Sequence, residues 1–251
     1  MGGAAILMKL HHRQASSVSP GHEKRINNFP ALTFSVLFLL FLPLLHGQQP
    51  TPLTPELTIR AMRRATAESY EDMLRKVKET DSGVSFREFR LAYADSSAYK
   101  PSSNPEARKS MFEALSAKEF AKAAELAEDI LQDRFVDIYG HQVASVAYRE
   151  LGDRAKAAVH GSIARELIRS IVESGDGNTP QTAMLLISEE EESVILQALE
   201  LKIVAQELID VEGHTFDRVE AMDSGDGMVT LYFNLDVPVI KVREAMAELP
   251  E

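Results

Sequence analysis

The sequence predicts an α+β fold in which an array of helical hairpins precedes a small antiparallel sheet. Two observations carry this prediction. Apolar residues recur at helical spacing between residues 57 and 174, whereas short runs with strand-like alternation and turn glycines follow residue 202. Helices and strands that occupy separate parts of a chain are typical of the α+β class.

Residues 1–47 have the features of a signal segment. Four Lys and Arg side chains precede an apolar run at 31–47, which is shorter than the roughly 20 residues that a spanning helix needs. Pro43 and Gly47 suit a cleavage region. We therefore expect an exported protein, periplasmic or extracellular, with no stable membrane span after cleavage. The alternative is a membrane tether through an uncleaved N-terminal segment.

Composition and charge limit the kinds of site and partner. The chain has no cysteine, which excludes disulfides, thiolate metal sites and cysteine nucleophiles. Residues 48–174 carry 19 basic and 20 acidic side chains, whereas residues 175–251 carry 4 and 17. This acidity argues against nucleic acid or anionic lipid as the partner of the C-terminal part. A solvated acidic shell and a surface for a basic partner both account for it.

The region after the signal segment begins with a proline-rich tether and two helices. Residues 48–56 contain three prolines and read as extended chain, and residues 57–79 predict a long amphipathic helix. Ser85 and Glu88 form a capping box that starts the next helix.

Three aromatic side chains share one face of this second helix, at Phe86, Phe89 and Tyr93. The expected arrangement puts them in the core and leaves Arg87 and Arg90 in water. The alternative is an Arg/Tyr surface for an anionic or planar ligand, with Tyr99 nearby.

Four further helices are predicted in the array, at 106–117, 119–132, 136–150 and 154–173. The small residues in the last two have the spacing of a tetratricopeptide unit, with Gly152 at the turn, and Ala123 lies 34 residues before Ala157. We therefore expect a tetratricopeptide-like array of about two units. Such a short array needs a cap.

The stretch "SGDGNTPQTAMLLIS" (174–188) is the predicted joint between the array and its cap. Gly175 suits a left-handed helix end, residues 176–178 form a turn, and 182–188 predict a buried strand. The glycines do not form a phosphate loop, because a helix precedes them and a strand follows. Ser188 and Glu191 form a second predicted capping box, with four acids in the first turn of the following helix.

The remaining residues predict a hairpin, a further strand and a final helix or arm. The runs at 202–211 and 214–222 flank the turn Glu212–Gly213, and residues 228–236 alternate strictly as a strand. Pro238 ends that strand, and residues 239–249 follow it. The chain thus divides into a signal segment 1–47, a tether 48–56, a helical array 57–174 and an acidic α+β cap 175–251.

The order of these segments resembles a family of exported bacterial proteins known as domain of unknown function 4919. The segments that carry the resemblance are "FREFRLAYADSSAYKP", "YRELGDRAKA", the joint at 174–188, "EEEESVILQALEL", "GHTFDRVEAMD" and "LYFNLDVP". The resemblance implies export, a helical front half and an α+β back half. It implies no activity and no catalytic residues.

No catalytic signature is present in the sequence: it lacks the G-x-S-x-G, H-E-x-x-H, G-x-x-x-x-G-K and G-x-G-x-x-G motifs. His214 and Asp217 would point to opposite faces of a strand, so we expect no metal site and no cofactor there. The leading prediction is a non-enzymatic interaction module that binds a protein or peptide. The alternatives are a hydrolase at the junction of the two parts and a purely structural envelope protein. Candidate ligand-binding residues are Arg87, Arg90, Tyr93, Tyr99, Asp176, His214 and Asn234.

Overall fold

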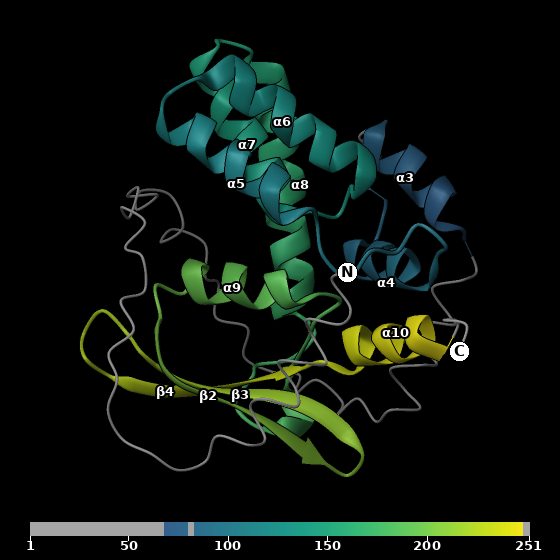
Figure 1. Ribbon diagram of the computed structural model, residues 1–251, viewed down its shortest axis with the longest axis vertical. Helices are drawn as coiled ribbons and strands as arrows, with labels where there is room; N and C mark the ends of the chain where they lie inside the picture. The colour runs from purple at the N-terminus through teal and green to yellow at the C-terminus, as the bar shows by residue number, and fades with distance from the viewer. Residues whose placement is uncertain (1–67, 80–82, 248–251) are drawn as a thin grey trace.

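The computed structural model describes residues 68–79 and 83–247 (Figure 1). The predicted signal segment, the tether and the first part of the predicted helix 57–79 lie outside these residues. The elements, in chain order, are α3 (Tyr70–Lys78), α4 (Phe86–Asp95), α5 (Pro105–Ser116), α6 (Phe120–Asp133), α7 (Ile138–Glu150), α8 (Arg154–Val172), a 3₁₀ turn η1 (Pro180–Thr182), β1 (Met184–Leu185), α9 (Glu189–Ala198), β2 (Lys202–Val211), β3 (His214–Met222), β4 (Met228–Asn234) and α10 (Asp236–Ala247).

Helices α5 to α8 form the upper part of the molecule in Figure 1 as a row of packed neighbours. Short turns join them, and α7 contacts α5, α6 and α8. Gly152, at the turn between α7 and α8, has a φ of 85°, which glycine adopts without strain. Asn104, Asp137 and Asp153 cap α5, α7 and α8 by accepting backbone N–H bonds. The predicted helical array is confirmed, whereas its tetratricopeptide-like character stays a prediction.

The sheet lies at the other end of the molecule and has the strand order β1-β4-β3-β2. Strands β2, β3 and β4 pair antiparallel, and the short β1 pairs parallel with β4 through Met184 and Leu185. Both residues of the predicted turn, Glu212 and Gly213, have positive φ. The sheet is mixed rather than purely antiparallel, and the α+β class is confirmed.

One core joins the helical array to the sheet. The lower half of α8 runs down to the sheet in Figure 1, and its residues Leu167 and Ile171 are fully buried in the same cluster as Phe233 of β4 and Phe89 and Tyr93 of α4. A second, smaller cluster fills the space among α5, α6 and α7. The array and the cap are therefore not separated by a solvated linker.

The joint at 174–188 differs from the prediction in two places. The left-handed glycine is Gly177, with a φ of 72°, and not Gly175. Gly175 is required for a different reason, because an added Cβ would lie less than 3.0 Å from backbone atoms of Thr182 and Ala183. The predicted strand 182–188 is buried, but only two residues of it pair as β1.

Pro238 lies inside α10, whose first turn accommodates it.

Candidate functional site

Arg90 is the centre of a buried polar cluster between α4, α8 and α9. Its side chain is 2% exposed. Its Nε donates to Glu191 Oε1 at 2.9 Å and its Nη2 donates to Glu191 Oε2 at 2.5 Å, which is a two-point ion pair. Arg90 also donates to Ser170 Oγ on α8 and to the carbonyl of Leu185 on β1. The expectation that Arg90 faces water is therefore wrong, because its partner comes from an element 101 residues later in the chain.

Glu191 joins this ion pair to the start of α9. Its Oε2 accepts the backbone N–H of Ile187 at 2.8 Å, while Ser188 makes no side-chain cap bond. The predicted capping box of Ser188 and Glu191 is therefore wrong. The carboxylate reaches back past Ser188 to the preceding residue, because Arg90 holds it on the buried side of the helix.

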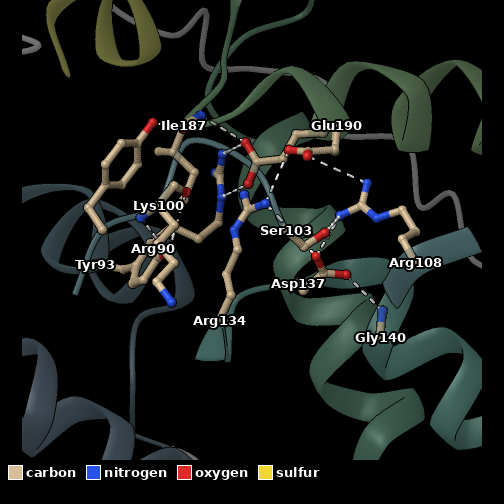
Figure 2. Close-up of polar contacts among 12 residues, drawn as sticks. Arg90, Tyr93, Lys100, Ser103, Arg108, Arg134, Asp137, Gly140, Ile187 and Glu190 are labelled. Atoms are coloured by element: carbon tan, nitrogen blue, oxygen red, sulfur yellow. Dashed lines mark hydrogen bonds and ion pairs between the residues drawn. The ribbon is translucent and has the colours of Figure 1, made fainter. Parts of the chain in front are cut away.

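A second group of charges continues the cluster along the same side of α9 (Figure 2). Arg134 Nη1 donates to Glu190 Oε2 at 3.1 Å, and Arg108 Nη2 donates to Asp137 Oδ2 at 2.7 Å. Arg108 Nη1 also lies 3.6 Å from Glu190 Oε1, and Arg108 Nη2 donates a hydrogen bond to Ser103 Oγ. Asp137 additionally accepts the N–H of Gly140 at the start of α7, so one carboxylate caps a helix and binds a guanidinium.

The charges of this cluster balance. The three guanidinium groups of Arg90, Arg108 and Arg134 face three carboxylates, at Asp137, Glu190 and Glu191. Burial lowers the pKa of Arg134, but the charges of Glu190 and Asp137 outweigh it and leave the pKa raised. A buried charge that is paired in this way is a structural element that costs several kcal/mol to break. The cluster thus serves to hold α4, α7 and α9 together.

Part of the acidic run 189–192 is consequently not a solvated shell. Glu191 and Glu192 are buried, and Glu192 accepts a hydrogen bond from Gln206 on β2 at 2.6 Å. Two carboxylates of the cap, Glu190 and Glu191, are thus paired with arginines of the nearly neutral helical array.

The two candidate tyrosines lie in or beside the core. Tyr93 is fully buried, and its hydroxyl accepts the N–H of Lys100 at 2.9 Å. Tyr99 is half-buried and donates to the carbonyl of Ile187 at 2.8 Å. Burial raises the pKa of both hydroxyls. Arg87 is exposed, whereas Arg90 and Tyr93 are buried, so the structure does not gather Arg87, Arg90, Tyr93 and Tyr99 into one ligand surface.

Two other candidates, His214 and Asn234, meet at a third residue that the sequence did not single out. His214 Nδ1 lies 2.5 Å from Asp236 Oδ2, and Asn234 Nδ2 donates to the same oxygen at 3.1 Å. The backbone N–H of Thr215 donates to Asp236 Oδ1 at 3.1 Å. All four residues are buried, and Asp236 is the first residue of α10. With a carboxylate on Nδ1, the ring proton of His214 lies between the two groups, and in the neutral ring Nε2 is an acceptor.

Asp176 does not join this group. It is exposed, and hydrogen bonds from the Thr182 side chain and from the backbone N–H of Asn178 lower its pKa. Within the described residues no hydrogen bond or ion pair links Asp176 to His214 or Asn234. Of the candidates Asp176, His214 and Asn234, the last two meet at Asp236, whereas Asp176 forms a turn. Asp217, three residues after His214 on β3, accepts a hydrogen bond from Gln206 of β2 at 2.6 Å.

A histidine pair inside the helical array was missed by the sequence reasoning. His141 and His160 face each other through their Nδ1 atoms at 3.0 Å, and both are buried. Burial lowers the pKa of His141 to about 3. The signal was available, since His141 lies three residues after Ile138 and three before Ala144 on the buried stripe of α7.

Two partly buried aromatic side chains, one from α5 and one from α7, pack against each other. Phe112 and Tyr139 are half-buried, and their rings meet edge to face with centroids 5.5 Å apart. The Arg108 guanidinium lies over the Tyr139 ring at 5.3 Å. Burial raises the pKa of Tyr139 to about 12, so its hydroxyl stays neutral. We call these three residues, Arg108, Phe112 and Tyr139, the aromatic face.

Two types of site are not found in the described part of the chain. None of its His, Asp and Glu residues form a group of three or more that suits a metal ion. None of its helices is both long enough and apolar enough to cross a bilayer.

Comparison with known proteins identifies the family. No curated protein and no solved structure is significantly similar to the chain. A family model described as "Domain of unknown function (DUF4919)" matches residues 58–243. This match covers the helical array, the joint, the sheet and most of α10, and it agrees with the resemblance noted in the sequence. The chain therefore belongs to the DUF4919 family.

Proposed function

We propose that the protein is a non-enzymatic interaction module of the cell envelope that binds a protein or peptide on the aromatic face of α5 and α7. The observation that supports this proposal is the half-buried pair Phe112 and Tyr139 with Arg108 over the Tyr139 ring. Tyrosine and arginine are enriched among the residues that carry binding energy at protein interfaces, and aromatic residues in general are enriched there.

The surrounding structure also favours this face. Rings that already pack against each other lose little conformational freedom when a partner covers them. Arg108 is held by Asp137 and Ser103, so the guanidinium is fixed over the ring before any partner arrives. Export of the protein rests on the sequence of residues 1–47 and is part of the proposal.

Retention of partners from an envelope extract tests the proposal, with residues 48–251 as bait. The variants are Phe112→Ala and Tyr139→Ala, and the matched control is Tyr148→Ala. Tyr148 is also a half-buried aromatic of α7, but nine residues from Tyr139, which puts it on the opposite side of the helix. We expect the wild type and the control to retain the same proteins, and the two face variants to lose them. Equal retention by all four baits would contradict the proposal.

A second candidate function has one specific observation in its favour. His214 is held by Asp236 in the way that a carboxylate orients a catalytic histidine, with Asn234 and Thr215 fixing the carboxylate. We infer that, if the protein is a hydrolase, His214 is its base. Hydrolytic activity on ester or peptide substrates that disappears in His214→Gln and persists in Asp176→Asn would support this function. Activity unchanged by His214→Gln would exclude it.

A further inference from the structure

Four polar side chains form a continuous chain from the core of the helical array to its surface. His141 of α7 contacts His160 of α8 through the two Nδ1 atoms at 3.0 Å. His160 Nε2 lies 3.3 Å from Glu128 Oε1 of α6. Glu128 also accepts the hydroxyl of Tyr148 at 2.9 Å. The chain thus links three helices and ends at Glu128, which is only partly buried.

The first members of the chain determine where the protons lie. The carbonyl of Phe135 accepts from His141 Nε2 at 2.8 Å, because a carbonyl has no proton to donate. Burial lowers the pKa of His141 to about 3, so this ring is neutral and its Nδ1 is an acceptor. The contact between the two Nδ1 atoms therefore requires His160 to donate from its own Nδ1.

This assignment leaves one contact that a neutral ring does not satisfy. A neutral His160 that carries its proton on Nδ1 presents a lone pair at Nε2, and that lone pair faces a carboxylate oxygen of Glu128. Two acceptors at 3.3 Å repel unless a proton lies between them. The geometry is that of a site with one proton more than two neutral rings.

We propose that His160 and Glu128 form a proton-binding site that latches α8 to α6. With the proton bound, His160 donates to His141 of α7 and to Glu128 of α6 at the same time. Without the proton, His160 keeps only its bond to His141, and Glu128 turns away from it. The latch therefore closes when the protein is acidified and opens at higher pH.

Four groups surround His160 and set the pH at which it binds the proton. Burial lowers its pKa, the charge and hydrogen bond of Glu128 raise it, and Lys156 on its own helix lowers it, with a net pKa below 6.5. His141 is neutral, and Tyr148 donates to Glu128 and stacks on the His160 ring with centroids 5.7 Å apart. Lys156 lies over the outer part of this group, 4.6 Å from the centroid of the Tyr148 ring.

Nitrogen NMR of the histidine rings tests the latch directly in the folded chain. The ¹⁵N shifts of His141 and His160 report tautomer and charge between pH 5 and 8. The variant is Glu128→Gln, which removes the charge but keeps a side chain of the same size. The matched control is Glu125→Gln, one turn earlier on α6, which changes the net charge equally at an exposed position without contacting His160.

We expect His141 to stay in the Nε2–H form throughout and His160 to gain its proton as the pH falls. The pKa of His160 should drop by roughly half a unit to one unit in Glu128→Gln, as expected for loss of a partly exposed ion pair, and stay unchanged in Glu125→Gln. A His141 that carries its proton on Nδ1 overturns the proposal, because His160 then accepts rather than donates. An equal pKa of His160 in the wild type and in Glu128→Gln overturns it as well.

Discussion

Arg87 and Arg90 lie less than one turn apart on α4 and have opposite environments. Arg87 is exposed, whereas Arg90 is buried and paired with Glu191. Helical periodicity predicts that both lie off the aromatic stripe, but it does not say whether water or another element covers that side. The covering element, α9, follows only after α5 to α8, and nothing near Arg90 in the sequence indicates it.

This contrast predicts different costs for the same substitution. Arg90→Met leaves Glu191 buried without its ion partner and should lower the free energy of unfolding by about 3–5 kcal/mol. Arg87→Met should change it by less than about 0.5 kcal/mol. Urea denaturation of the two variants measures both values. Adding Glu191→Gln to Arg90→Met should recover at least half of the loss, because a neutral amide still accepts from Ile187.

The buried His141 predicts an acid-sensitive stability. Its pKa falls from 6.5 in the unfolded chain to about 3 in the fold, so below pH 6.5 the unfolded state binds the extra proton and the folded state does not. The free energy of unfolding should therefore be highest above pH 6.5 and fall by up to about 1.4 kcal/mol per pH unit on acidification. Denaturation curves between pH 7 and 4 should show a smaller slope in His141→Gln. An unchanged slope would mean that His141 is not held neutral.

At the scale of helices and strands, the boundaries could be predicted where they depend on neighbouring residues in the sequence. Strands β2 and β3 occupy the predicted residues. Their signals, strand-like residues on both sides of the turn at Glu212 and Gly213, come from consecutive residues of the chain. The bounds of helices α5 to α8 agree with the predicted bounds to within two residues, because helical spacing and the short turns are also local signals. Helix α9 begins after Ser188 as predicted, but the capping box of Ser188 and Glu191 is wrong, since the partner of Glu191 comes from a distant helix.

Two glycines, Gly175 in the joint and Gly213 in the turn between β2 and β3, predict distinct effects of the same substitution. Gly175→Ala places a methyl group less than 3.0 Å from backbone oxygens, which do not rotate away. Gly213→Ala meets no atom within 4 Å and suffers only from its φ of 85°. We expect Gly213→Ala to cost about 1–2 kcal/mol and Gly175→Ala clearly more. Thermal melting of the pair measures the order, and a milder effect at Gly175 would show that the close approach is wrong.

At the scale of the whole molecule, the helical array and the cap share one hydrophobic core. Composition changes sharply near residue 175, from nearly neutral to strongly acidic, and this change suggested two separate parts. The structure instead packs α8 against the sheet and places arginines of the array against glutamates of the cap. Charge asymmetry along a chain is thus a weak guide to domain boundaries, because opposite charges from the two parts can meet at a buried seam.

The candidate site follows the same pattern. The residues that the sequence offered as ligand-binding candidates are polar groups near this seam, and most of them hold elements together. Arg90 bonds α9, Tyr93 bonds the loop after α4, Tyr99 bonds the segment before α9, and Asp176 forms a turn. His214 and Asn234 were both candidates, and they meet at Asp236, which the sequence did not single out.

The central claim is that the helical array and the cap unfold as one cooperative unit, because the Arg90–Glu191 ion pair and the common core hold them together. Native-state hydrogen exchange tests it most directly, by comparing the slowest amides of α8 with those of β3 and β4. We predict the same opening free energy in all three elements and an equal decrease in all of them in Arg90→Met. A clearly lower value in the strands, or a decrease confined to one part, would contradict the claim and show that the two parts unfold independently.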